Sequence, residues 1–148
     1  MNSFARSSFL CLAIAVPWSH AAAPDQSLVG CWRAVKIVLL TQDGTRTEDT
    51  SGRCSLRFKD DQFESSCGTS GARAVTTTYQ YRVVRPGFYA ATMTASTFRT
   101  DLLGATREYE YRIEGDRLFT VTGGPAKPPA ASTGAGRVEL EAARTPCP

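Results

Sequence analysis

Histidine and asparagine are almost missing from this chain of 148 residues, where they occur once each, as His20 and Asn2. Both lie in an N-terminal segment that we expect to be removed from the mature protein. The rest of the chain has no imidazole for Ser-His-Asp or Cys-His catalysis, or for binding a metal ion. Without a base to activate a serine or threonine, the sequence predicts neither an enzyme nor a cofactor.

Long hydrophobic runs are also missing, so we expect no membrane span. The longest early run, residues 9–16, follows Arg6 and ends at Pro17, and small residues follow at positions 19–23. A basic start, a short apolar centre and small residues near a cleavage point are typical of a secretory signal peptide. We expect residues 1–23 to be cleaved, which leaves residues 24–148 as a single domain in the periplasm or outside the cell.

A clustered basic patch is missing as well. Without Arg6, 16 basic and 14 acidic residues remain, so the net charge of the mature chain is +2. The arginines are scattered over strand positions that we expect to face solvent, among them Arg57, Arg82, Arg112 and Arg137. Nucleic-acid binding proteins gather such charges on one face, and we therefore expect no nucleic acid partner.

The acidic residues predict no metal or catalytic site. Asp60 and Asp61 are adjacent, but at a hairpin tip we expect them to be solvated turn residues. Other acidic residues that are close in sequence face outward or lack metal-ligand spacing: Asp43, Glu48, Asp49, Glu108, Glu110, Glu139 and Glu141.

Four cysteines remain after the signal segment and its Cys11 are removed. An even number of cysteines behind an export signal predicts disulfides, and the chain has no Cys-x-x-Cys. Four cysteines permit three connectivities. The hairpin register favours Cys54–Cys67, which leaves Cys31–Cys147 to join the first strand to the end of the chain.

Residues 54–67 predict a β-hairpin that turns at Asp60 and Asp61. A single register places an aromatic pair, a charge pair and a cysteine pair opposite each other: Phe58 with Phe63, Arg57 with Glu64, and Cys54 with Cys67. We therefore interpret this stretch as a hairpin joined by a disulfide.

Two more hairpins are predicted at residues 73–95 and 105–122. Tyrosines and other apolar residues alternate with polar ones in both, and glycine marks both turns. In the first, Tyr89, Ala91 and Met93 return opposite Val83, Tyr81 and Tyr79. In the second, a two-residue and a three-residue loop both give acceptable pairing.

The remaining segments predict two further strands and two loops. Residues 28–40 and 137–143 are the expected first and last strands. Residues 41–52 predict a polar loop or lid, and residues 123–136, rich in Gly, Pro and Ala, predict a flexible loop. No segment has convincing helical periodicity. The sequence thus predicts an all-β fold, an antiparallel up-and-down meander of about eight strands that closes into a barrel.

The first strand opens with Gly30-Cys31-Trp32, which resembles the Gly-x-Trp motif of lipocalins and lipocalin-like small barrels. The resemblance implies an eight-stranded barrel in which the tryptophan plugs one end. It also implies that an arginine from near the C-terminus packs over that tryptophan, and Arg137 or Arg144 could serve. The long helix that lipocalins place before their final strand is missing here.

A second lipocalin motif is half matched by Thr100-Asp101. A different short match, residues 28–31, fits the bacterial lipobox, whose cysteine is lipidated after cleavage. Polar residues at positions 24–27 precede this match, and lipidation of Cys31 would leave Cys147 unpaired. Anchoring through Cys31 therefore remains the minor alternative to a cleaved, unanchored protein.

Aromatic side chains are the main functional lead, because most of them fall on the predicted inner face. They either fill the core or line a cavity that has an apolar wall and a few hydroxyl groups. For the second case, the candidate ligand-binding residues are Trp32, Phe58, Tyr79, Tyr81, Tyr109 and Tyr111.

The sequence therefore favours an exported binding module for a small apolar or amphipathic ligand. One alternative is a periplasmic interaction protein, such as an inhibitor of an exported hydrolase, which would contact its partner through residues 41–52 and 123–136. The other alternative is a structural envelope protein without a ligand.

Overall fold

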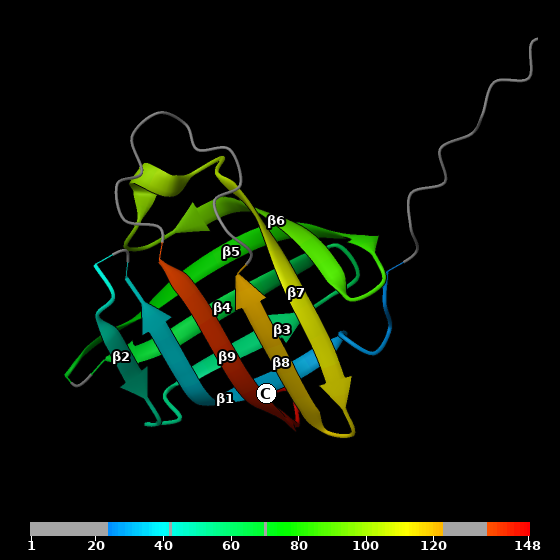
Figure 1. Ribbon diagram of the computed structural model, residues 1–148, viewed down its shortest axis with the longest axis horizontal. Coiled ribbons are helices and arrows are strands. Elements are labelled where there is room, and N and C mark those ends of the chain that lie inside the picture. Colours follow the sequence, from blue (N-terminus) through cyan, green and yellow to red (C-terminus); the bar gives the residue numbers. More distant parts are fainter. Residues whose placement is uncertain (1–23, 42, 70, 123–135) are drawn as a thin grey trace, which may run out of the picture.

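The computed structural model describes residues 24–41, 43–69, 71–122 and 136–148. The predicted signal segment and nearly all of the predicted 123–136 loop lie outside these ranges. The described residues form nine β-strands and one 3₁₀ turn (Figure 1). Their bounds are β1 (Gly30–Leu40), β2 (Arg46–Asp49), β3 (Cys54–Phe58), β4 (Gln62–Thr69), β5 (Ala72–Arg85), β6 (Phe88–Ser96), η1 (Thr100–Leu102), β7 (Thr106–Glu114), β8 (Arg117–Thr122) and β9 (Arg137–Thr145).

The sheet closes on itself through its first and last strands. Strands β3 to β9 pair antiparallel with their neighbours in chain order, and β1 pairs with both β3 and β9. The β1–β9 ladder runs from Cys31 opposite Thr145 to Leu40 opposite Arg137. The predicted up-and-down barrel of eight strands is therefore confirmed, and closure removes the two open edges of the meander.

The predicted loop at residues 41–52 is wrong in part, because Arg46–Asp49 form strand β2. This strand pairs with the second half of β1, while β3 pairs with the first half. All four residues of β2 are exposed, so none of the alternation that marks a half-buried strand is present. The tight turn before it is held by Asp43 Oδ1, which accepts hydrogen bonds from the Thr41 hydroxyl and the Thr45 amide.

The predicted hairpin registers are confirmed. In β3–β4 the pairs Cys54–Cys67, Arg57–Glu64 and Phe58–Phe63 lie opposite each other. In β5–β6, Met93, Ala91 and Tyr89 lie opposite Tyr79, Tyr81 and Val83. The β7–β8 hairpin uses the two-residue loop, because Glu114 pairs with Arg117 and Gly115 takes a φ of +58° at the turn.

Both predicted disulfides are present. Cys31 bonds to Cys147 with a Cα–Cα distance of 5.2 Å, and Cys54 bonds to Cys67 with a Cα–Cα distance of 4.0 Å. The first joins β1 to the segment after β9, next to the barrel's closing ladder. Such bonds persist in an oxidising environment.

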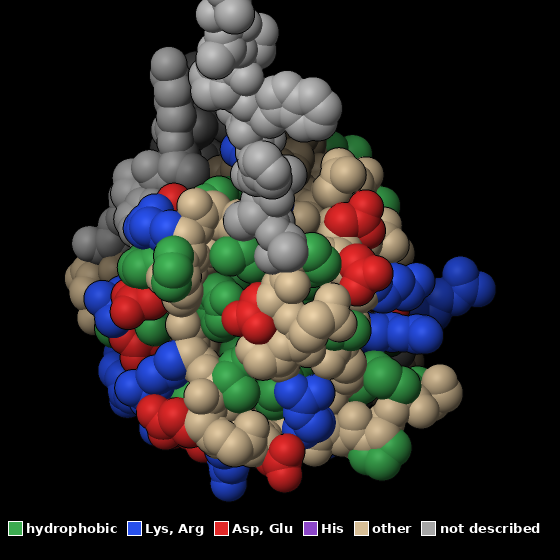
Figure 2. Space-filling view, turned by 90° about the vertical axis from the view of Figure 1, so that its right-hand side faces the viewer, with side chains coloured by type: hydrophobic (Ala, Val, Ile, Leu, Met, Phe, Trp, Pro, Cys, Tyr) green, Lys and Arg blue, Asp and Glu red, His purple; other side chains and the backbone are tan. Residues whose placement is uncertain are grey.

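One end of the barrel, here called the Trp32 end, is packed solid. Trp32 and Leu28 are fully buried, and the indole N–H donates to the Leu28 carbonyl over 2.9 Å. The β5–β6 and β7–β8 turns lie on this side of the molecule, whereas η1 lies at the opposite end, here called the η1 end (Figure 1). Figure 2 faces the side of the Trp32 end, where hydrophobic side chains gather in the middle and most charged ones lie around them.

Arg144 is the arginine that covers Trp32. Its guanidinium lies 4.1 Å from the centre of the indole ring and donates to the carbonyls of Ser27 and Val29. Gly30 makes room for it: its φ is +130°, and a Cβ built there would lie 2.9 Å from Arg144 Nη1. The glycine, the tryptophan and the arginine thus form one packed unit at this end.

No helix within the described ranges has the length and apolar character needed to cross a membrane.

Candidate ligand-binding cavity

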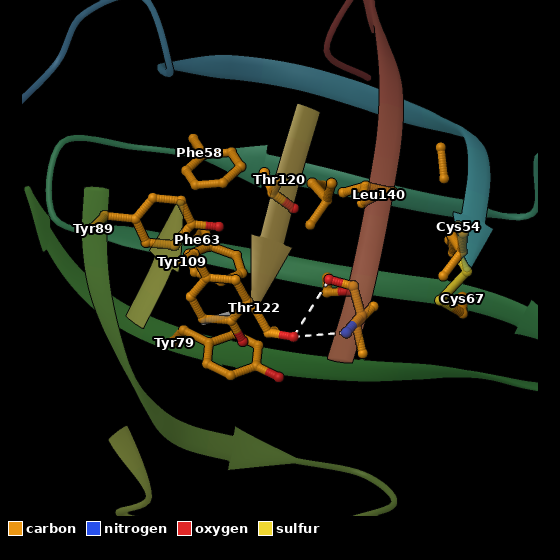
Figure 3. Close-up of a pocket in the computed structure, with 15 residues that line it drawn as sticks. Cys54, Phe58, Phe63, Cys67, Tyr79, Tyr89, Tyr109, Thr120, Thr122 and Leu140 are labelled. Atoms are coloured by element: carbon orange, nitrogen blue, oxygen red, sulfur yellow. Dashed lines mark hydrogen bonds between the residues drawn. A yellow bond between two sulfur atoms is a disulfide. The ribbon is translucent and has the colours of Figure 1, made fainter. Parts of the chain in front are cut away.

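A cavity of about 150 Å³ lies inside the barrel, walled by side chains from eight of its strands (Figure 3). Its apolar wall consists of Ala34, Ile37, Leu56, Phe58, Phe63, Val138, Leu140 and the Cys54–Cys67 disulfide. Its hydroxyl groups come from Ser65, Tyr79, Tyr89, Tyr109, Thr120 and Thr122. The disulfide that the sequence predicts as a hairpin staple therefore also forms part of the cavity wall.

Aromatic stacking makes this wall rigid. Phe63 stacks on Phe58 and on Tyr79, with ring centroids 4.7 and 4.6 Å apart. Tyr89 stacks on Tyr109 at 4.9 Å. The alternation of each strand explains these contacts, because directly opposite inward residues of paired strands bring their rings together.

Threonines on β8 place hydroxyl groups on the inner face. Thr120 and Thr122 are both buried, and they lie on the same face of β8 as the buried Leu118. The Thr122 hydroxyl accepts from the Val138 amide over 2.6 Å and donates to the Val138 carbonyl over 3.4 Å (Figure 3). The Thr122 side chain thus bonds to the Val138 backbone just beyond the last β8–β9 ladder pair, Val121 with Glu139.

The cavity is mainly apolar, and its polar groups are uncharged. None of the described side chains that line it is an Asp, Glu, Lys or Arg. A tyrosine hydroxyl is neutral at pH 7, and burial raises the pKa of Tyr79, Tyr89 and Tyr109 further above the ordinary value. The cavity therefore suits an uncharged apolar group that can make a few hydrogen bonds to hydroxyls.

The six candidate residues from the sequence divide into two groups. Phe58, Tyr79 and Tyr109 line the cavity. Trp32, Tyr81 and Tyr111 do not line it; Tyr81 and Tyr111 pack behind Tyr89, one of the rings of the cavity wall.

Those other two tyrosines have protein partners for their hydroxyls. Tyr81 donates to the Lys59 carbonyl over 2.7 Å, and Tyr111 donates to Asp25 Oδ2 over 2.6 Å. Burial, together with neighbouring carboxylates, raises the pKa of Tyr81 to about 12. Both hydroxyls are therefore hydrogen-bonded within the protein and are not free for a ligand.

Tyr89, Ser65, Thr120 and Thr122 are cavity residues that the sequence reasoning did not select. Tyr89 could have been found, because it shares strand parity with Ala91 and Met93 in the predicted β5–β6 pairing. Ser65, Thr120 and Thr122 could have been recognised only as polar residues at strand positions that face the barrel interior. No group of three or more metal-ligating side chains occurs among the residues that the structure describes.

The solved structures that resemble this chain include two from Bacteroides species. A lipocalin-like protein from Bacteroides uniformis is 10% identical, with a TM-score of 0.51 over 80% of this chain and 98% of that one. The fold is lipocalin-like. An uncharacterized protein from Bacteroides eggerthii is 9% identical, with a TM-score of 0.50 over 79% of this chain and 98% of that one.

The likeness extends to the fold alone. No protein-family model and no curated protein sequence matches the chain. An eight-stranded barrel of this size can be filled by its own side chains or can hold one small ligand, so the fold by itself does not assign a role.

Proposed function

We propose that this protein is an exported binding module that takes a small, uncharged apolar group into the interior of its lipocalin-like barrel. The observation that carries the proposal is the cavity itself, which combines an apolar wall, rigid aromatic stacks and inward hydroxyls. A barrel that served only as a scaffold would gain stability by filling this space, because cavities in a core cost free energy.

The volume of the cavity limits the size of its ligand. A dry apolar cavity of about 150 Å³ in another protein accepts benzene. The cavity described above has a similar volume. We therefore expect it to take one aromatic ring or a short alkyl chain, with a hydrogen bond to a tyrosine or threonine hydroxyl.

Export is part of the same proposal. The signal-like features of residues 1–23 support it, and two disulfides agree with an oxidising compartment such as the periplasm or the extracellular space. Both native disulfides use all four cysteines of the mature chain, so Cys31 has a partner other than a lipid.

Small aromatic probes test the proposal. Toluene and phenol are titrated into the mature protein and followed by ligand-observed NMR, with Ser65→Phe as the blocking variant, because Ser65 lines the cavity. The matched control is Ser66→Phe on the opposite face of β4, where Ser66 lies near the Thr76 hydroxyl. We expect Ser65→Phe to weaken binding at least about tenfold and Ser66→Phe to leave it unchanged, because only the first ring fills the cavity. Absence of binding to the wild type, or equal binding by both variants, would contradict the proposal.

A second candidate, contact with an exported protein, is favoured by one observation. Phe98 and Leu103 flank η1 and are 70% and 47% exposed. Exposed large apolar side chains on one connection are suited to a protein contact. Co-purification of a partner with the wild type but not with Phe98→Ser and Leu103→Ser together would support it, and retention by the double variant would exclude this surface.

A further inference from the structure

Arg107 is an arginine that points into the barrel. It lies on β7 directly opposite Ala91, which is 1% exposed, and directly opposite residues share a face of the sheet. Its neighbours on that face are Tyr109 and Tyr111, whereas Thr106 on the other face bonds to Thr92 outside the barrel. A charged side chain at such an inward position is uncommon, because an inward strand position normally packs an apolar group.

Within the part of the chain that the structure describes, Arg107 has no carboxylate partner. Other arginines, such as Arg85 and Arg117, make ion pairs with Glu, and none of the ion pairs among the described residues includes Arg107. The undescribed segments cannot supply a partner side chain, because residues 1–23, 42, 70 and 123–135 contain no Asp or Glu. Arg107 therefore carries a positive charge that this chain does not neutralise.

The guanidinium faces a recess of about 150 Å³ at the η1 end. Arg107 lines it together with Tyr79, Tyr109, Met93 and Leu102. Burial raises the pKa of Tyr79, and the nearby charge of Arg107 offsets part of that rise, which agrees with the two groups being close. The recess thus combines one cation, two hydroxyls and an apolar floor.

The recess adjoins the inner cavity. Tyr79 and Tyr109 line both spaces, so these two rings form the wall between them. A molecule that passes these rings can contact both spaces. Arg99 also lines the recess, but it is held by Asp101 through two hydrogen bonds of 2.9 and 2.8 Å, so Arg107 is the charge left for a ligand.

We propose that the recess at Arg107 binds the carboxylate of an amphipathic ligand whose apolar end occupies the inner cavity. This inference rests on the proposed function and adds the chemical class of the ligand, a small aryl or alkyl carboxylate. A guanidinium presents a planar fork of donors that matches the two oxygens of a carboxylate. The tyrosine hydroxyls of the shared wall supply further donors to the same oxygens.

A matched pair of probes tests the inference on the wild-type protein. 4-Phenylbutyrate and 4-phenylbutan-1-ol share the aromatic ring and chain and differ only in the charged head. Their affinities are measured by calorimetry at neutral pH and low salt. We expect the carboxylate to bind about tenfold or more tightly than the alcohol, because a hydrogen bond to a charged partner is stronger than a neutral one.

Variants at Arg107 assign the preference to this side chain. Arg107→Gln is expected to abolish the preference for the carboxylate while the affinity for the alcohol changes less than about twofold. Arg107→Lys, which keeps the charge, is expected to retain part of the preference. The control is Arg82→Gln, an exposed arginine on the outer face of β5, which should change neither affinity.

The outcomes separate the two proposals. Equal affinities for the two probes, or a preference that survives Arg107→Gln, would overturn the carboxylate site and leave the binding module intact. Binding of neither probe would overturn both. Ser65 lines the inner cavity and not the recess, so loss of 4-phenylbutan-1-ol binding in Ser65→Phe would support the inner cavity as the site of the aromatic ring, and unchanged binding would contradict it.

Discussion

Arg144 performs three contacts at once at the Trp32 end. It stacks over Trp32 and donates to two carbonyls of the segment before β1, so it joins the last strand to the residues that precede the first. Arg144 is an exposed residue, but its side chain is 34% exposed, so these contacts are shielded from water only in part. A second arginine, Arg112, stacks over Phe119 at a similar 4.2 Å, but its side chain is 65% exposed.

These two arginines make a matched pair for mutation. We expect Arg144→Ala to lower the free energy of unfolding by about 2–3 kcal/mol, because it removes a partly shielded cation–π contact and two hydrogen bonds. Arg112→Ala should cost about 0.5–1 kcal/mol, since its contact is solvated. Urea unfolding followed by Trp32 fluorescence measures both, and an equal cost for the two variants would contradict this ranking.

All five tyrosines of the chain lie on the inner face, and burial raises the pKa of each above 10. The folded protein therefore keeps tyrosine protons that the unfolded chain loses above about pH 10. This contribution to stability is complete below about pH 10 and is lost as the pH rises toward and beyond the folded value, which is about 12 for Tyr81.

An alkaline titration follows tyrosinate absorbance together with the β-sheet circular dichroism signal. No tyrosine should ionise near pH 10 while the fold is intact. A reversible tyrosine titration near pH 10 with an unchanged circular dichroism spectrum would contradict the buried placement of that residue.

Single hairpins were the elements that the sequence predicted best. The pairing of Phe58 with Phe63 and of Cys54 with Cys67 follows from local complementarity, because a shift by one residue would turn every side chain to the other face. Strand β2 could not be predicted in the same way. Its residues are all exposed, and its pairing depends on β1 continuing past the point where β3 ends.

The turn before β2 decides whether this strand stays paired. Asp43→Ala removes the acceptor for Thr41 and Thr45, and we expect faster amide hydrogen exchange in Arg46–Asp49 while the β1–β9 ladder stays protected. Asp43→Asn keeps a side-chain oxygen and is the control, with exchange close to that of the wild type. Unchanged protection of β2 in Asp43→Ala would show that the turn is dispensable.

At the scale of the molecule, closure was predictable but the cavity was not. The predicted meander of about eight strands, the Gly30-Cys31-Trp32 motif and the Cys31–Cys147 pair all indicated a closed barrel. The empty volume depends instead on the combined sizes of fifteen side chains from eight strands, which no local pattern records. This is why the sequence named Phe58, Tyr79 and Tyr109 together with Trp32, Tyr81 and Tyr111, although only the first three face the cavity.

The two disulfides act on loops of very different length, with sequence separations of 116 and 13 residues. In the chain-entropy model, loss of Cys31–Cys147 should cost about 4–5 kcal/mol and loss of Cys54–Cys67 about 3 kcal/mol. Paired Cys→Ala variants and urea unfolding measure the difference. Only the second pair lines the cavity, so probe binding should change in that variant alone; a change in the first would contradict the assignment of the cavity wall.

The pairing of β1 with β9 also has a consequence for the order in which the protein matures. Synthesis begins at the N-terminus, so β1 waits with one unpaired edge until β9, more than a hundred residues later, has been made. Long-range pairing of this kind is slow, and an open edge can capture another chain. During that interval Cys31 has only Cys54 and Cys67 within reach, and formation of their own bond protects it from a wrong partner. If the Cys54–Cys67 bond forms first, Cys31 stays available for Cys147.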